Sequence, residues 1–98
     1  MNEGHYQIEF TGLAKEQLKS IVRRAVKTDR PARFAAAMRH LLEQLALNPT
    51  EIGEPICRLA SMKMHIRRVA LAPIYLEYGI HFTKPLVIVR RVIGMAGA

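Results

Sequence analysis

The order of predicted elements assigns this chain of 98 residues to the α+β class. Alternating apolar residues open the chain, two stretches of helical periodicity follow, and the alternation returns after a loop marked by proline and glycine. Helices that occur together before a meander of strands pack as a hairpin on one face of the sheet. The sequence therefore predicts the order β-α-α-β-β-β in a small, mainly antiparallel sheet, whose other face is free to carry function.

The first half of the chain predicts a strand and then a helical hairpin. Residues 5–10 alternate between polar and apolar side chains, as a half-buried strand does. Thr11 follows as the expected N-cap of a helix over about 12–27, whose apolar residues recur at steps of three and four. A second amphipathic helix starts near Pro31 and ends before Pro49, because proline cannot continue a helix.

The second half of the chain predicts a loop and three strands. The loop covers 50–55, and residues 56–60 form a short extended piece. Strands are expected over 62–71, 74–82 and 86–93. The whole chain, 1–98, is expected to form a single domain with a flexible tail over about 94–98.

Alternation assigns the side chains of these strands to the two faces of the sheet. The first of them breaks parity at Arg68 and Val69, which predicts a bulge or a register change there. The last is apolar on both faces until Arg90, as expected for an inner strand covered on both sides. In the first strand, Met62, Met64 and Ile66 are expected to face the core, and Lys63, His65 and Arg67 to face outward. In the second strand, Ile74, Leu76, Tyr78, Ile80 and Phe82 are expected to point inward, and Tyr75, Glu77, Gly79 and His81 outward.

Positive charge is concentrated in the second half of the chain. Residues 55–98 contain seven Lys and Arg against one acidic residue, whereas residues 1–54 contain eight against seven. Six of the seven formal net positive charges therefore lie in the second half of the chain, which holds the predicted meander of strands. A concentrated positive field on a sheet favours a polyanion or an acidic protein as the partner.

Composition also limits the compartment and the chemistry. Cys57 is the only cysteine, so no internal disulfide can form, which fits a reducing cytosol. The four histidines lack the spacing of a metal site, and we therefore expect no metal and no cofactor. The first residues lack the regions of a signal peptide, and no apolar run is long enough to span a membrane. We expect a soluble, cytoplasmic protein with no membrane partner.

Four segments carry a resemblance to a known family. They read Tyr6-Gln-Ile-Glu-Phe-Thr-Gly-Leu-Ala, Leu47-Asn-Pro-x-x-x-Gly-Glu-Pro, Pro73-Ile-Tyr-Leu-Glu-Tyr-Gly-Ile and Leu86-Val-Ile-Val-Arg-Arg-Val. With the element order, they resemble the RelE/ParE superfamily of small bacterial toxins over about 5–93. The resemblance implies the toxin of a type II toxin–antitoxin pair, bound by an acidic antitoxin protein from the same operon.

The same resemblance implies two modes of action. RelE-like proteins cut messenger RNA on the ribosome without a metal, and ParE-like proteins inhibit DNA gyrase without catalysis. The chain has no Tyr or His after Ile93, where RelE-like nucleases usually carry one. A nuclease, a gyrase inhibitor and an inactive relative that only binds its antitoxin therefore stay open as interpretations.

Cleavage of RNA without a metal needs a base for the 2′-hydroxyl, an acid for the leaving oxygen and cations for the phosphate. Two adjacent arginines in a strand point to opposite faces, so one of each pair is expected to reach the sheet edge or a structural ion pair. The catalytic candidates are His65, Arg67, Tyr75 and Arg91. The candidates for binding nucleic acid or an acidic partner are Arg58, Lys63, Arg68 and Arg90.

Overall fold

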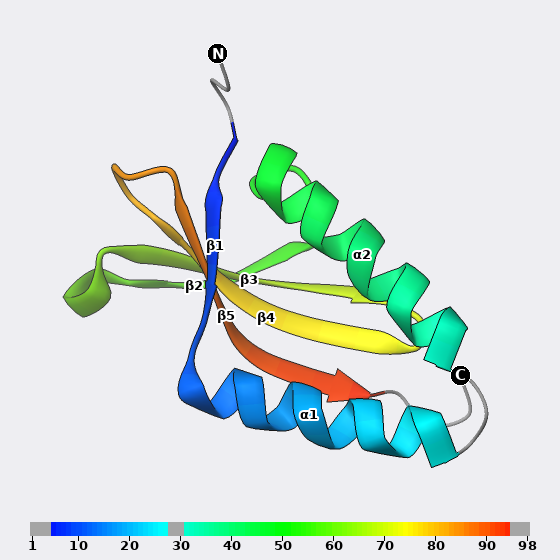
Figure 1. Cartoon of the computed structure of the whole chain (residues 1–98). Coiled ribbons are helices and arrows are strands. Elements are labelled where there is room, and N and C mark those ends of the chain that lie inside the picture. Colours follow the sequence, from blue (N-terminus) through cyan, green and yellow to red (C-terminus); the bar gives the residue numbers. More distant parts are fainter. Residues whose placement is uncertain (1–4, 28–30, 95–98) are drawn as a thin grey trace.

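In the computed structural model, which describes residues 5–27 and 31–94, two helices pack on one face of a five-stranded mixed sheet (Figure 1). The sheet order is β1-β5-β4-β3-β2. The elements are β1 (Gln7–Phe10), α1 (Gly12–Lys27), α2 (Pro31–Leu47), β2 (Glu54–Leu59), the 3₁₀ turn η1 (Ala60–Met62), β3 (Met64–Leu71), β4 (Ile74–His81) and β5 (Leu86–Gly94). The predicted α+β class is confirmed.

The predicted start of the fold is confirmed with small shifts of boundary. Strand β1 begins at Gln7 and pairs in parallel with the inner strand β5. Thr11 caps α1, since its Oγ1 accepts a hydrogen bond of 3.1 Å from the amide of Ala14. The amide of Asn48 still bonds to the Gln44 carbonyl, 2.7 Å away, so the helical hydrogen bonds end next to the proline.

Four strands follow the helices, one more than the sequence predicted. The extra strand is β2, which includes the predicted extended piece and the end of the predicted loop, and pairs antiparallel with β3. The predicted strand over 62–71 starts only at Met64, because η1 and the left-handed Lys63 (φ 55°) turn the chain first. Met62 was therefore wrongly predicted to face the core, and its side chain is 49% exposed.

The core lies between the helices and one face of β4 and β5. The inward pattern predicted for β4 is confirmed from Ile74 to Ile80. Phe82 is an exception, because it follows the strand and is neither in the core cluster nor packed against it. The core cluster contains Ala14, Ile21, Phe34, Ala37, Met38, Leu41, Leu45, Ile74, Leu76, Tyr78, Ile80, Val87, Val89 and Val92.

Strand β3 faces the opposite way from the prediction. Residues directly opposite each other in neighbouring strands share a face, and His65 lies opposite the core residue Ile80. His65 and Arg67 are therefore on the helix-bearing face of the sheet. Met64 and Ile66 are buried on the other face, where they cover Gly79, whose missing side chain leaves room for them.

The predicted bulge at Arg68 and Val69 is wrong, because β3 and β4 pair without interruption from Met64 to Leu71. The register shifts at two other places, between Pro55 and Cys57 of β2, and in β5, where Glu77 lies opposite Arg91 and Tyr78 lies opposite Val89. Val89 and Val92 both point to the core, so Arg90 and Arg91 both lie on the outer face. Gly94, predicted to open the flexible tail, ends β5, and the rest of that tail is outside the described residues.

Neither helix of the described ranges is long and apolar enough to cross a membrane.

Candidate functional site

A cleft opens on the helix-bearing face of the sheet, beside the part that the helices cover. The main contacts of the helices with the sheet are to β1, β4 and β5, and β2 lies at the far edge of the sheet from β1. Figure 1 shows the helices and the order of the strands. The cleft has a volume of about 470 Å³, and the loop after α2 forms one of its walls. It is lined by Thr50, Pro55, Ile56, Cys57, His65, Ile66, Arg67 and Ile80.

A cluster of cationic and aromatic side chains lies at the end of this cleft near the start of β3. His65 is exposed and lies opposite Arg58 in the pairing of β3 with β2. The rings of His65 and Phe82 are 4.7 Å apart between centroids, at 54°. The Arg58 guanidinium lies 4.6 Å from the centroid of the Phe82 ring, which is a cation–π contact. Lys63 ends the turn before β3 and is exposed.

Arg67 holds the loop that forms the cleft wall. Its Nε and Nη2 atoms donate hydrogen bonds of 3.2 and 3.0 Å to the carbonyl of Ile52, and Nη2 also donates to the carbonyl of Gly53 at 3.1 Å. Gly53 has φ +69°, and a Cβ there would collide with the Arg68 carbonyl oxygen. The guanidinium of Arg67 therefore satisfies backbone carbonyls, and does not need a carboxylate partner on this face.

Tyr78 supports the same loop from inside the core. Its side chain is fully buried, and its hydroxyl lies 2.9 Å from the Pro49 carbonyl oxygen and 3.0 Å from that of Ile52, to either of which it can donate. Burial raises the pKa of Tyr78 above its ordinary value of 10.0, while the neighbouring Arg67 acts to lower that pKa. Tyr78 and Arg67 together fix the loop between α2 and β2.

Replacement of Tyr78 by Phe is expected to lower the free energy of unfolding by about 1–3 kcal/mol, because it leaves a buried carbonyl oxygen without its donor. The folded state keeps this phenol protonated above the pH at which the unfolded chain ionises it, so stability should fall as pH rises above about 10. The variant should lose the contribution of Tyr78 to that fall. Urea unfolding at pH 7 and at several pH values above 9 measures both effects, and an unchanged slope above pH 10 would contradict the assignment.

The outer face of the sheet carries a ladder of alternating charges. Glu54 lies opposite Arg68, Arg68 opposite Glu77, and Glu77 opposite Arg91. Two of the arginines form ion pairs, Arg68 with Glu54 at 3.9 Å and Arg90 with Glu77 at 3.4 Å. The first pair is exposed and contributes little stability, whereas the second is largely shielded from water. Most of the charge on this face is thus matched within the sheet.

The cations on the cleft side are not matched in this way. None of Arg58, Lys63 and Arg67 forms an ion pair with a carboxylate in the described ranges 5–27 and 31–94. The residues predicted for catalysis are therefore divided between two faces. His65 and Arg67 line the cleft, whereas Tyr75 and Arg91 lie on the outer face, opposite Ala70 and Glu77 respectively.

The residues predicted for binding are divided in the same way. Arg58 and Lys63 lie near His65, and Arg68 and Arg90 belong to the charge ladder of the outer face. Phe82 was missed as a candidate site residue, because the alternation of β4 assigned it to the core. The Thr-Lys-Pro turn that directly follows Phe82 was the available sign that the strand ends at His81. No group of three potential metal ligands occurs among the residues that the structure describes.

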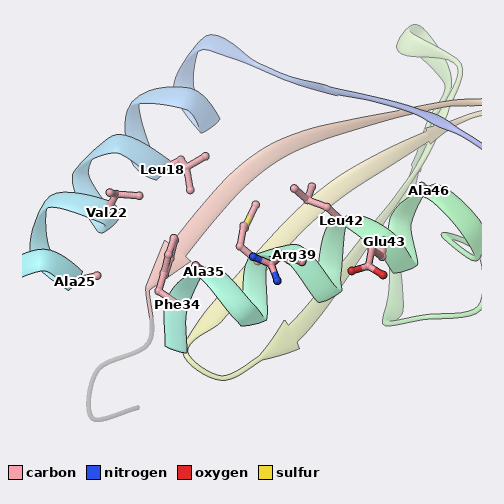
Figure 2. Close-up of a pocket in the computed structure, with 10 residues that line it drawn as sticks. Leu18, Val22, Ala25, Phe34, Ala35, Arg39, Leu42, Glu43 and Ala46 are labelled. Atoms are coloured by element: carbon pink, nitrogen blue, oxygen red, sulfur yellow. The ribbon is translucent and has the colours of Figure 1, made fainter. Parts of the chain in front are cut away.

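A second concave surface lies between the two helices. Figure 2 shows Leu18 and Val22 of α1 facing Phe34 and Leu42 of α2 across this groove, with Arg39 and Glu43 on the α2 side. Its volume is about 720 Å³ and its lining is almost entirely apolar. Val22 is 42% exposed, so a substantial apolar surface is open to water. The lining residues are Leu18, Val22, Ala25, Phe34, Ala35, Met38, Arg39, Leu42, Glu43 and Ala46.

The helical hairpin on a five-stranded mixed sheet is a fold also found in chains of two toxin–antitoxin systems. The chain is similar to a chain of the RelBE2 toxin–antitoxin complex from Mycobacterium tuberculosis, with a TM-score of 0.66, 21% identity, and coverage of 96% of this chain and 95% of that chain. It is also similar to a chain of the chromosomal ParDE toxin–antitoxin system from P. aeruginosa, with a TM-score of 0.65, 11% identity, and coverage of 95% and 99%. No family model and no curated protein matches the sequence.

Proposed function

We propose that this chain is the toxin of a type II toxin–antitoxin pair and that it cleaves messenger RNA in the cleft beside β3, without a metal. The proposal is supported first by the fold, which is similar to chains of the RelBE2 and ParDE systems. The observation that carries the RNA part is the exposed His65 among cations that no described carboxylate neutralises. An exposed imidazole in a positive field suits chemistry on a phosphodiester.

In this proposal His65 acts as the general base. It takes the proton of a ribose 2′-hydroxyl, whose oxygen attacks the adjacent phosphorus and displaces the 5′-oxygen of the next nucleotide. The products are a 2′,3′-cyclic phosphate and a 5′-hydroxyl, and the leaving oxygen takes its proton from water. Arg58 and Lys63 stabilise the charge that develops on the phosphoryl oxygens. Arg67 keeps the cleft wall in place through the carbonyls of Ile52 and Gly53.

The antitoxin is proposed to bind in the groove between α1 and α2. The groove is apolar and open, which suits the apolar face of an amphipathic helix. The exposed cations Lys15 and Arg23 of the same helix α1 suit acidic residues of such a partner. This arrangement requires a small acidic protein, which we expect to be encoded next to this chain.

One observation favours a second function, inhibition of DNA gyrase without catalysis. Among the residues that the structure describes near the cleft, His65 is the one imidazole, and Tyr75 lies on the other face of the sheet. Arg67 is committed to two loop carbonyls. A site with a single acid–base group resembles a binding surface more than the two-group arrangement that RNA cleavage usually uses.

Inducible expression in a bacterial host separates these functions when growth and the integrity of a reporter messenger RNA are read together. We expect growth arrest with cut messages, and relief of both effects by the acidic protein of the adjoining reading frame. Arrest with intact messages and filamentous cells would replace RNA cleavage by gyrase inhibition. Normal growth with full expression of the folded chain would contradict the toxin proposal.

A further inference from the structure

The ring of Phe82 has a position that core packing does not explain. Phe82 follows β4, and its amide donates a hydrogen bond of 2.8 Å to the carbonyl of Lys63, which fixes it beside the start of β3. Its side chain is partly exposed and is not packed against the core cluster. It contacts two exposed side chains instead, the guanidinium of Arg58 and the imidazole of His65.

Phe82 and Arg58 form an aromatic and cationic surface next to the proposed catalytic imidazole, whose ring is tilted by 54° to that of Phe82. The Arg58 guanidinium lies 4.6 Å from the centroid of Phe82, and the His65 ring lies 4.7 Å from it. Arg58 has no carboxylate partner within the described part of the chain, so its charge is available to a ligand. Aromatic rings and guanidinium planes are the surfaces on which unpaired bases stack.

We propose that Phe82 and Arg58 form a stacking site for one base of a single-stranded RNA, and this inference rests on the proposed function. The base stacks on the pair that the Phe82 ring and the Arg58 guanidinium form. The phosphate on the 3′ side of that nucleotide then lies among Arg58, Lys63 and His65. The ribose 2′-hydroxyl of the same nucleotide reaches the imidazole. The substrate is accordingly a strand whose bases are unpaired, because a paired base cannot reach this surface.

Binding of a 2′-O-methyl oligonucleotide tests the inference apart from cleavage, because such a strand has no 2′-hydroxyl to attack the phosphorus. The oligonucleotide carries a fluorophore, and its anisotropy is compared with that of an abasic strand of the same length. The wild type is expected to bind the strand with bases about tenfold more tightly than the abasic strand. Phe82→Leu is expected to remove this preference and to keep the affinity for the abasic strand.

Three further variants assign the effect. Arg58→Lys keeps the charge but loses the plane, so it should lower the preference for bases more than it lowers affinity for the abasic strand. Tyr75→Leu changes an aromatic residue on the outer face and should leave both affinities unchanged. Circular dichroism and thermal unfolding identify any variant that fails to fold, and Phe82→Tyr, which keeps the ring, should retain the preference.

The outcomes distinguish this inference from the proposed function. Equal affinity of the wild type for both strands, or a preference that survives Phe82→Leu, would overturn the stacking site even if RNA is cleaved. A preference for bases that depends on Phe82, in a protein that leaves an unmodified RNA intact, would support the stacking site and remove the cleavage step. Failure to bind either strand would overturn the stacking site, and cleavage of messages on translating ribosomes then decides the proposed function separately.

Discussion

Replacement of Val22 by Asp is expected to weaken antitoxin binding by about 100-fold. Val22 lines the groove between α1 and α2 and is 42% exposed, so the free protein can carry a carboxylate there at little cost. An apolar helix that docks in the groove would bury that carboxylate without a partner, which is strongly unfavourable. Isothermal titration with the acidic protein of the adjoining reading frame measures the change, and co-expression tests whether neutralisation of the toxin is lost.

The matched control is Leu13→Asp. Leu13 is also on α1, is 60% exposed and does not line the groove. Nine residues separate it from Val22, which is two and a half helical turns, so the two side chains lie on opposite sides of the helix. Leu13→Asp should change the affinity by less than about threefold, within the usual range for a surface substitution. Equal losses for both variants, or no loss for Val22→Asp, would place the antitoxin elsewhere on the toxin.

The sequence predicted the helices well because their signals are local. Thr11 supplies the capping oxygen, the apolar steps of three and four mark the buried stripe, and Pro49 stops the second helix. Each of these signals acts within one or two turns of the chain. The alternation of β4 was equally informative, because its inward residues form the centre of the core.

The face of β3 could not be predicted in the same way. Alternation separates Met64 and Ile66 from His65 and Arg67, but it does not say which set faces the helices. Met64 and Ile66 are buried without any helix above them, because they cover the surface that Gly79 leaves open on the neighbouring strand. That arrangement depends on the register between two strands, which no periodicity within one strand contains.

The arginine pairs show a similar limit. Each pair was expected to divide between the two faces, and Arg67 and Arg68 do so. Arg90 and Arg91 share the outer face, because the register shift in β5 adds a residue between Val89 and Val92. A bulge is set by pairing with the next strand and is visible in sequence only as a break in parity. In β5 that break is the pair Arg90 and Arg91 between the inward residues Val89 and Val92. The prediction instead placed the break at Arg68 and Val69.

The position of the candidate cleft follows from these two points. The helices were expected to leave one whole face of the sheet free for function, but the cleft lies on their own face, beside β2 and β3, which are not among their main contacts. His65 and Arg67 therefore lie in a recess next to the core, where the loop held by Tyr78 supplies a wall. The charge ladder of the outer face provides cross-strand ion pairs instead, which make Arg68 and Arg90 less available to a ligand.

Replacement of His65 by Ala is expected to lower the rate of RNA cleavage by about 10²–10⁴-fold, because the 2′-hydroxyl loses its general base. The side chain is exposed, so stability should change by less than about 1 kcal/mol. His40→Ala is the matched control, since His40 is exposed on α2 and lies outside both concave surfaces, and it should cleave at the wild-type rate. The measurement is the rate at which purified protein cuts messages on translating ribosomes, with the 5′-hydroxyl product identified.

Addition of imidazole gives a second measurement that separates a catalytic base from a structural contact. His65 also packs against Phe82, so its loss could displace the ring and lower activity indirectly. Free imidazole can replace a missing base in the cleft of His65→Ala, but it cannot restore a displaced Phe82. Partial recovery of cleavage by imidazole, with no effect on the wild type, is therefore expected if His65 takes the proton. Cleavage by His65→Ala at the wild-type rate would exclude that role, and growth arrest by the same variant with intact messages would turn the assignment to gyrase.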